Sequence, residues 1–289
     1  MLHSNKIRFC FYGFLMLAFV LTGVDVSAQD KDKDKEKNKN KTSYKREFCS
    51  NNWSNGDKVS GSEVRDVTVP GGNLTVDGKR NGGISVRGEN RSDILIRACV
   101  QTWGNTAEEA AQLARSIRIE TGGTVRAEGV SDESGWSVSY QILVPRTTNL
   151  NLTTMNGGIS IADVEGTIQF EAKNGGIHLS NLAGDVKGRT TNGGLHIELT
   201  GNTWKGSGID VETTNGGVHL SMSETYAARF ETRTVNGGFK SDIAALAVEK
   251  TEDENGYRQR GVNISRDLNG GGALVRIVTT NGGVKIGSN

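Results

Sequence analysis

The sequence predicts an all-β fold, a single-chain β-solenoid of stacked two-strand rungs with about 18–23 residues each and one short N-terminal helix. Three observations predict it. The tripeptide Asn-Gly-Gly recurs at Asn81, Asn156, Asn174, Asn192, Asn215, Asn236 and Asn281. Several of these copies lie 18–23 residues apart, and apolar and polar residues alternate on both sides of them. A period near 20 residues is typical of solenoids, and 39 glycines with only 2 prolines are typical of a turn-rich β protein.

The first element, residues 1–28, is predicted to be a signal peptide. Lys6 and Arg8 precede an apolar run over 9–24, and the small residues at 26–28 resemble a cleavage site. The run is shorter than the roughly 20 residues of a spanning helix, which disfavours an uncleaved anchor. We therefore expect no membrane span after cleavage and a periplasmic, secreted or cell-surface location.

Residues 29–47 are predicted to be a charged, low-complexity linker. The stretch DKDKDKEKNKNK at 30–41 alternates in sign and contains no residue that could enter a core. Without residues 1–28 the chain carries equal numbers of basic and acidic residues. That balance argues against a nucleic-acid binder, which would show a basic excess.

Two cysteines remain after the predicted cleavage, Cys49 and Cys99. In an oxidising compartment an even pair usually closes, so we predict a Cys49–Cys99 disulfide. Two buried thiols are the alternative, because nothing in the sequence fixes the distance between them.

Residues 48–145 are predicted to form an N-terminal β region with one helix over 106–118. Strand-like stretches are NLTVDG around Val76, DILIRACV from Asp93, GTVRAEG from Gly123 and WSVSYQILVP from Trp136. Thr106 and Glu109 have the spacing of a capping box. The apolar face of the helix, made by Ala110, Leu113, Ala114 and Ile117, is expected to cover the first rung.

Residues 146–289 are predicted to be the regular Asn-Gly-Gly solenoid, continuous with 48–145. Six residues before the asparagine the last six copies are apolar: Leu150, Ile168, Val186, Ile209, Phe230 and Val275. We expect the glycines to supply the positive φ angles of a sharp turn. The stacked asparagine amides are expected to hydrogen-bond along the axis.

An outward column three residues before the asparagine alternates in charge, Glu171, Arg189, Glu212 and Arg233, and predicts a ladder of ion pairs between neighbouring rungs. Two insertions, 201–208 and 241–272, are expected to be surface loops, the second with a hairpin at 254–257. Trp204 in the first insertion could contact a sugar or partner, or pack back onto the coil.

A short helix after a strand, the strand end ILVP at 142–145 and the repeated Asn-Gly-Gly rungs resemble the bacterial putative-adhesin family of toast-rack-like β-solenoid domains. The resemblance covers roughly residue 60 onward. It implies an exported, stacked β domain that presents a surface, and it implies no reaction.

Three histidines, His178, His196 and His219, occupy one outward column four residues after the repeat asparagine. On adjacent rungs they could turn toward one Zn²⁺ or Cu²⁺, with Zn²⁺ as the cofactor that we predict for this column. The alternative is drift among polar residues, since no carboxylate in that column would orient a site. Without a metal, the column should gain positive charge only as the pH falls below about 6.5.

We expect no enzymatic activity. Familiar catalytic motifs are absent from the sequence, and a carbohydrate-active enzyme on this scaffold would need clustered carboxylates. The available pairs, Asp163 with Glu165 and Asp210 with Glu212, are read more simply as solvated edges.

The leading hypothesis is an exported, non-enzymatic adhesin-like module that presents a binding surface to a glycan, a cell-envelope component or a protein. The first alternative is a structural homo-oligomer built by end-to-end stacking, because no cap is visible after Ile286. The second alternative is the carbohydrate-active enzyme.

Overall fold

The computed structural model describes residues 48–49, 58–129, 135–248 and 261–289. The predicted signal peptide, the linker and the hairpin at 254–257 lie outside these residues. Within them, no helix is long and apolar enough to cross a membrane. Residues 46–289 form one compact unit, and the fold is the mostly-β solenoid that the sequence predicts.

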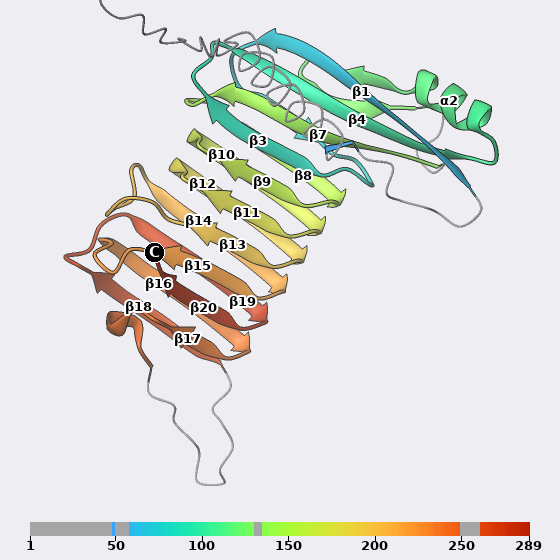
Figure 1. Cartoon of the computed structure of the whole chain (residues 1–289). Helices are drawn as coiled ribbons and strands as arrows, with labels where there is room; N and C mark the ends of the chain where they lie inside the picture. The colour runs from blue at the N-terminus through green and yellow to red at the C-terminus, as the bar shows by residue number, and fades with distance from the viewer. Residues whose placement is uncertain (1–47, 50–57, 130–134, 249–260) are drawn as a thin grey trace, which may run out of the picture. The chain divides into compact units, whose positions relative to one another are not determined.

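Two ten-stranded sheets enclose one hydrophobic core (Figure 1). Sheet A contains, in spatial order, β1 (Val59–Pro70), β4 (Asp93–Gly104), β7 (Trp136–Pro145), β3 (Ile84–Glu89), β9 (Ile159–Ala162), β11 (Ile177–Ser180), β13 (Leu195–Glu198), β15 (Val218–Met222), β20 (Val284–Ser288) and β17 (Phe239–Ser241). Sheet B contains β18 (Val262–Leu268), β16 (Ala228–Asn236), β19 (Leu274–Asn281), β14 (Gly208–Asn215), β12 (Ala183–Asn192), β10 (Glu165–Asn174), β8 (Leu150–Asn156), β2 (Leu74–Asp77), β6 (Thr124–Glu128) and β5 (Arg118–Glu120).

Each rung is a strand of sheet B, an Asn-Gly-Gly corner and a strand of sheet A, and equivalent strands of neighbouring rungs pair in parallel. Apolar residues point inward at every second position, as in β10, where Ile168, Phe170 and Ala172 are buried. The inward side chain is missing at Gly188 of β12, and the ring of Phe170 fills the space where its Cβ would be.

The repeat asparagines form the predicted ladder along one corner of the coil. Six of the seven amide nitrogens donate to the side-chain oxygen of the asparagine on a neighbouring rung, at distances from 2.7 to 3.1 Å, and Asn81 accepts the first of these bonds. In spatial order the ladder is Asn81, Asn156, Asn174, Asn192, Asn215, Asn281 and Asn236. The ladder keeps the corners of all seven rungs in register.

The predicted role of the glycines at this corner is wrong. At the seven rung corners, none of the Asn-Gly-Gly glycines has a φ in the left-handed region. The copy at Asn269 lies outside these corners, and its glycines are left-handed, with φ 96° at Gly270 and 81° at Gly271. The first glycine is required because the rungs approach closely: a methyl group at Gly175 would overlap the carbonyl oxygen of Gly157. Left-handed residues occur instead at the opposite corner, at Asp163 (φ 61°) and Asn181 (φ 49°), whose side chains are hydrogen-bonded at 2.7 Å.

A buried threonine column adds a second set of bonds between rungs. Two residues before the asparagine, a threonine hydroxyl donates to the carbonyl of the first glycine of the preceding rung, as Thr190 does to Gly175 at 2.8 Å. The same bond is made by Thr154, Thr213, Thr279 and Thr234. One rung has Ala172 at this position.

We expect Ala172→Thr to raise the free energy of unfolding by about 1 kcal/mol, because its hydroxyl would reach the carbonyl of Gly157 as the neighbouring threonines reach theirs. Thr154 and Thr190 flank Ala172 in the column, so the added side chain has a precedent on both sides. Ala172→Val, which adds the same bulk without a hydroxyl, is the control in a urea titration. Equal stabilisation by valine and threonine would contradict the hydrogen bond.

The last rung in the sequence is not the last rung in space. The pair β19–β20 lies between β14–β15 and β16–β17 (Figure 1). The predicted neighbours Glu212 and Arg233 are therefore separated by Val278, and that step of the ion-pair ladder is wrong. The step between Glu171 and Arg189 is confirmed, with an N–O distance of 3.0 Å.

The expected open end after Ile286 is also wrong. The insertion 241–272, predicted to be a surface loop, contains β18, which pairs antiparallel with β16 at the edge of sheet B. It also contains the short 3₁₀ helix η1 (Ala244–Leu246), where Ile243 and Leu246 are buried in the core. Antiparallel pairing and buried apolar residues therefore cap this end of the coil.

The opposite end carries the predicted helix, α2 (Ala107–Ser116), beside β1 and β4 (Figure 1). Thr106 caps its N-terminus by accepting a hydrogen bond from the backbone of Glu109 at 3.2 Å. Arg65 of β1 donates to the carbonyls of Ala114 and Ile117 at its C-terminus. These bonds satisfy groups that a helix end otherwise leaves unpaired.

Candidate binding groove on the outer face of sheet A

The histidine column lies on the outer face of sheet A, as predicted. His178, His196 and His219 occupy adjacent parallel strands, are exposed, and have ring centroids 5.5 Å apart at each step. Ser160 precedes them in the same row, and Lys285 and Lys240 follow on β20 and β17. The row therefore runs from a hydroxyl through three imidazoles to two ammonium groups.

A strip of glycines runs beside this row. The second glycine of each Asn-Gly-Gly lies two residues before the row position, so it faces the same side of the sheet. Gly176, Gly194, Gly217 and Gly283 floor an open groove of about 490 Å³, with His178, His196, His219 and Lys285 along one side. The groove forms because four consecutive rungs have a glycine, and therefore no side chain, at this position.

The floor is closed to backbone hydrogen bonding with a ligand strand. Ile177 donates its N–H to the carbonyl of Gly194, and the equivalent bonds lead from Leu195 to Gly217 and from Val218 to Gly283, at 2.8–2.9 Å. A ligand would therefore meet glycine surface and the side chains of the row. The sequence analysis missed the groove, although the period-2 spacing between glycine and histidine could have revealed it.

The groove has a cationic bias. Lys285 and Lys240 carry positive charge in the row, and Glu198, two residues after His196, is an exposed carboxylate on the same face. Ser180 and Ser221 are its neighbours in the flanking column.

The geometry gives the zinc hypothesis no support. Nitrogen ligands must converge to within 2.0–2.1 Å of one ion, whereas the middle imidazole separates the two outer rings. In the described part of the chain, no group of three or more His, Cys, Asp or Glu residues is arranged to hold a metal.

Of the two roles considered for Trp204, the structure shows packing onto the coil. The side chain is only 6% exposed, and its indole N–H donates to the carbonyl of Gly184 at 3.0 Å. The insertion 201–208 therefore closes over the corner instead of projecting the ring toward a ligand.

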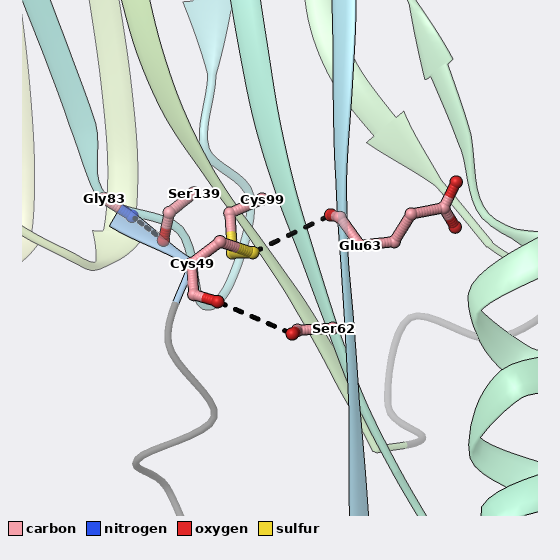
Figure 2. The surroundings of a disulfide bond; sticks show 6 residues. All are labelled: Cys49, Ser62, Glu63, Gly83, Cys99 and Ser139. Carbon is pink, nitrogen blue, oxygen red and sulfur yellow. Dashed lines mark hydrogen bonds between the residues drawn. A yellow bond between two sulfur atoms is a disulfide. The ribbon is translucent and has the colours of Figure 1, made fainter. Parts of the chain in front are cut away.

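The structure contains the Cys49–Cys99 disulfide (Figure 2). Cys99 of β4 is 1% exposed, and Ser62 of the neighbouring strand β1 donates to the carbonyl of Cys49 at 3.5 Å. The bond fixes the segment at residue 49 to sheet A.

In each carboxylate pair considered for catalysis, one member accepts a hydrogen bond from a side chain on a neighbouring rung. Arg276 donates to Asp210 at 2.5 Å, and Asn181 donates to Asp163 at 2.7 Å. Both contacts are structural links between rungs.

Three groups with shifted pKa values lie outside the groove. The hydrogen bond from Arg65 lowers the pKa of Glu63, and burial raises the pKa of Tyr140. Burial also raises the pKa of Tyr226 to about 12. All three keep their neutral-pH charge states, so none is poised as an acid or base there.

Comparisons with solved structures find distant similarity in fold. A putative cell adhesion protein from Clostridium sporogenes has 13% identity and a TM-score of 0.40, with 80% of this chain and 100% of that chain covered. A putative adhesin from Bacteroides fragilis has 9% identity and a TM-score of 0.29, with 79% and 97% covered. No curated protein sequence matches this chain.

The family comparison agrees with the architecture of repeated rungs. The family described as Toastrack DUF4097 matches residues 23–286, nearly the whole chain, and the chain belongs to this family.

Proposed function

We propose that this Toastrack protein is an exported, non-enzymatic binding module that holds an extended ligand of the cell envelope or its surroundings on the outer face of sheet A. The observation that carries the proposal is the groove, in which four consecutive rungs present the same glycine floor beside a polar row. A repeated surface suits a repeated ligand, because each rung offers equivalent contacts.

The predicted signal peptide and the disulfide support the export of this chain. Disulfides persist in the periplasm and outside the cell, whereas cytosolic thiols are kept reduced. The two sheet faces are broad and regular, which favours presentation of a surface over enclosure of a small substrate. We place the protein in the periplasm or at the cell surface.

The self-assembling polymer is the weaker candidate. Its support was an uncapped last rung, and the described residues place that rung inside the stack with β18 and η1 beyond it. The outer face of sheet A remains available in the described chain, so binding to this face is the function that the geometry favours.

Filling the groove should abolish binding without unfolding the protein. In Gly176→Gln/Gly217→Gln, the new Cβ atoms meet nothing closer than 3.5 Å, and the two side chains cover the floor. We expect at least about a tenfold loss of affinity, equivalent to about 1.4 kcal/mol, when the full chain is screened against neutral and acidic linear polysaccharides.

The control places glutamines at exposed positions outside the groove, Thr191→Gln/Thr214→Gln, at the Asn-Gly-Gly corners of the same region. This variant should bind like the wild type. Equal loss of affinity in both variants would contradict the proposed function, as would an absence of binding to every polymer.

A further inference from the structure

We infer that the groove binds an acidic linear polysaccharide. The inference rests on the proposed function and deepens it by naming the ligand class. It depends on the charges of the row, the spacing of the row and the chemistry of the floor.

The charges of the row select an anion. Successive positions from β11 to β17 carry His178, His196, His219, Lys285 and Lys240, and this row contains no carboxylate. Each of these side chains is exposed. An anionic polymer along the row would therefore meet cationic or protonatable groups at five consecutive rungs.

The spacing of the row suits a repeating polymer. The histidine rings are 5.5 Å apart at each step, close to the strand separation of about 4.8 Å. This distance is comparable with the length of one sugar unit. A charged group on every sugar, or on every second sugar, would meet the row without a change in register.

The floor disfavours anionic ligands other than polysaccharides. The glycines leave the sheet surface bare, and their carbonyls accept bonds from the next strand, so the floor offers no edge to an added peptide strand. Apart from the imidazoles, no aromatic side chain lines the groove to stack on nucleic-acid bases. The exposed large apolar residues Val59, Met155, Val235 and Val248 lie outside it, which disfavours a lipid surface.

Hydroxyl groups occupy most of the positions around the histidines. Ser160 lies at one end of the row and Lys285 and Lys240 at the other, and Ser180, Glu198 and Ser221 flank the imidazoles on the same face. Glu198 is the carboxylate beside the histidines, and Asp242 follows Lys240 at the far end. An anionic ligand along the row would therefore meet a carboxylate beside the row, and none within it.

The test compares dextran sulfate with dextran, two polymers of the same backbone, and adds polygalacturonate as a carboxylate polymer. Binding of the full chain is measured at pH 7.5 in low salt. We expect both acidic polymers to bind and dextran to bind at least about tenfold more weakly.

Two variants locate the binding. His178→Asn/His196→Asn/His219→Asn should weaken the binding of dextran sulfate, and Glu198→Gln should tighten it about two- to threefold. The matched control removes three cations from the outer face of sheet B, Lys187→Gln/Arg189→Gln/Arg233→Gln, and should bind like the wild type. Histidine side-chain NMR signals should shift when dextran sulfate is added.

Several results would overturn the inference. If dextran bound as tightly as dextran sulfate, the inference that the ligand is anionic would be wrong, and the proposed function would still stand. Unchanged binding of dextran sulfate by the triple histidine variant would place the binding site elsewhere. Preferential binding of single-stranded DNA or of anionic lipid vesicles would replace the polysaccharide, and failure of every polymer to bind would overturn the proposed function as well.

Discussion

Replacing Gly175 with alanine is expected to lower the free energy of unfolding by about 3 kcal/mol, the upper range for overpacking a tightly packed site. A methyl group at this first glycine of a repeat would overlap the carbonyl oxygen of Gly157 on the neighbouring rung. That oxygen belongs to backbone held by strand pairing on both sides, so it cannot move without breaking the register. A solenoid of this size should lose roughly 6–12 °C in melting temperature.

The adjacent glycine provides the control. The Cβ of an alanine at Gly176 would lie 3.5 Å from the nearest atom, the carbonyl oxygen of Gly194, and the residue does not have a left-handed φ. Gly176→Ala should therefore change stability by less than about 1 kcal/mol, because it removes only the freedom of the unfolded chain. Equal destabilisation by the two variants would show that the corner requires backbone flexibility, and the close-approach explanation would be wrong.

This contrast also shows what the sequence could reveal about the repeat. The spacing of Asn-Gly-Gly predicted the rung, its inward columns and the asparagine ladder, because each depends on local periodicity. It did not predict why the first glycine is needed. Close approach between rungs is a tertiary property, and φ preference is only one of the reasons for a glycine.

The spatial order of the rungs could not be predicted from the repeat alignment, for a different reason. All rungs share the same column chemistry, so the alignment could not place β19–β20 between two earlier rungs. One signal was present five residues before the asparagine. Lys187, Asp210, Arg276 and Glu231 alternate in sign only in the observed spatial order, whereas the sequential order would place Asp210 beside Glu231.

The capping strands were missed because they are less regular than the rungs. β1 contains only exposed and half-buried residues, because it is the edge strand of sheet A and β4 is its one pairing partner among the described strands. β18 has just two buried residues, Ile264 and Leu268. Edge strands with one pairing partner need few apolar residues, so their sequences resemble surface loops.

One part of the candidate site, the polar row, could be predicted from the sequence, and the groove beside it could not. The histidines and lysines share a column, and this much follows from counting residues from the asparagine. A groove requires in addition that the neighbouring column lacks side chains. In the structure, the second glycines line the groove beside the histidines, and none of them has a left-handed φ. Their effect is to leave the neighbouring column without side chains.

Loss of the disulfide is expected to cost about 4 kcal/mol, because Cys49–Cys99 closes a loop with a sequence separation of 50 residues. The chain-entropy contribution grows with the length of the closed loop, and residue 49 reaches sheet A from outside the regular strand pairing. Cys49→Ser should therefore unfold at a markedly lower urea concentration than the wild type under oxidising conditions.

Reduction of the wild type separates the covalent constraint from the substitution itself. A reductant should bring the wild-type midpoint down to that of Cys49→Ser and leave the variant unchanged, since Cys99 remains covered by packing in both proteins. If the reduced and oxidised wild type unfolded at the same midpoint, the loop would not be entropically significant. Stability would then reside in the seven registered rungs, and an oxidising compartment would not be needed for folding.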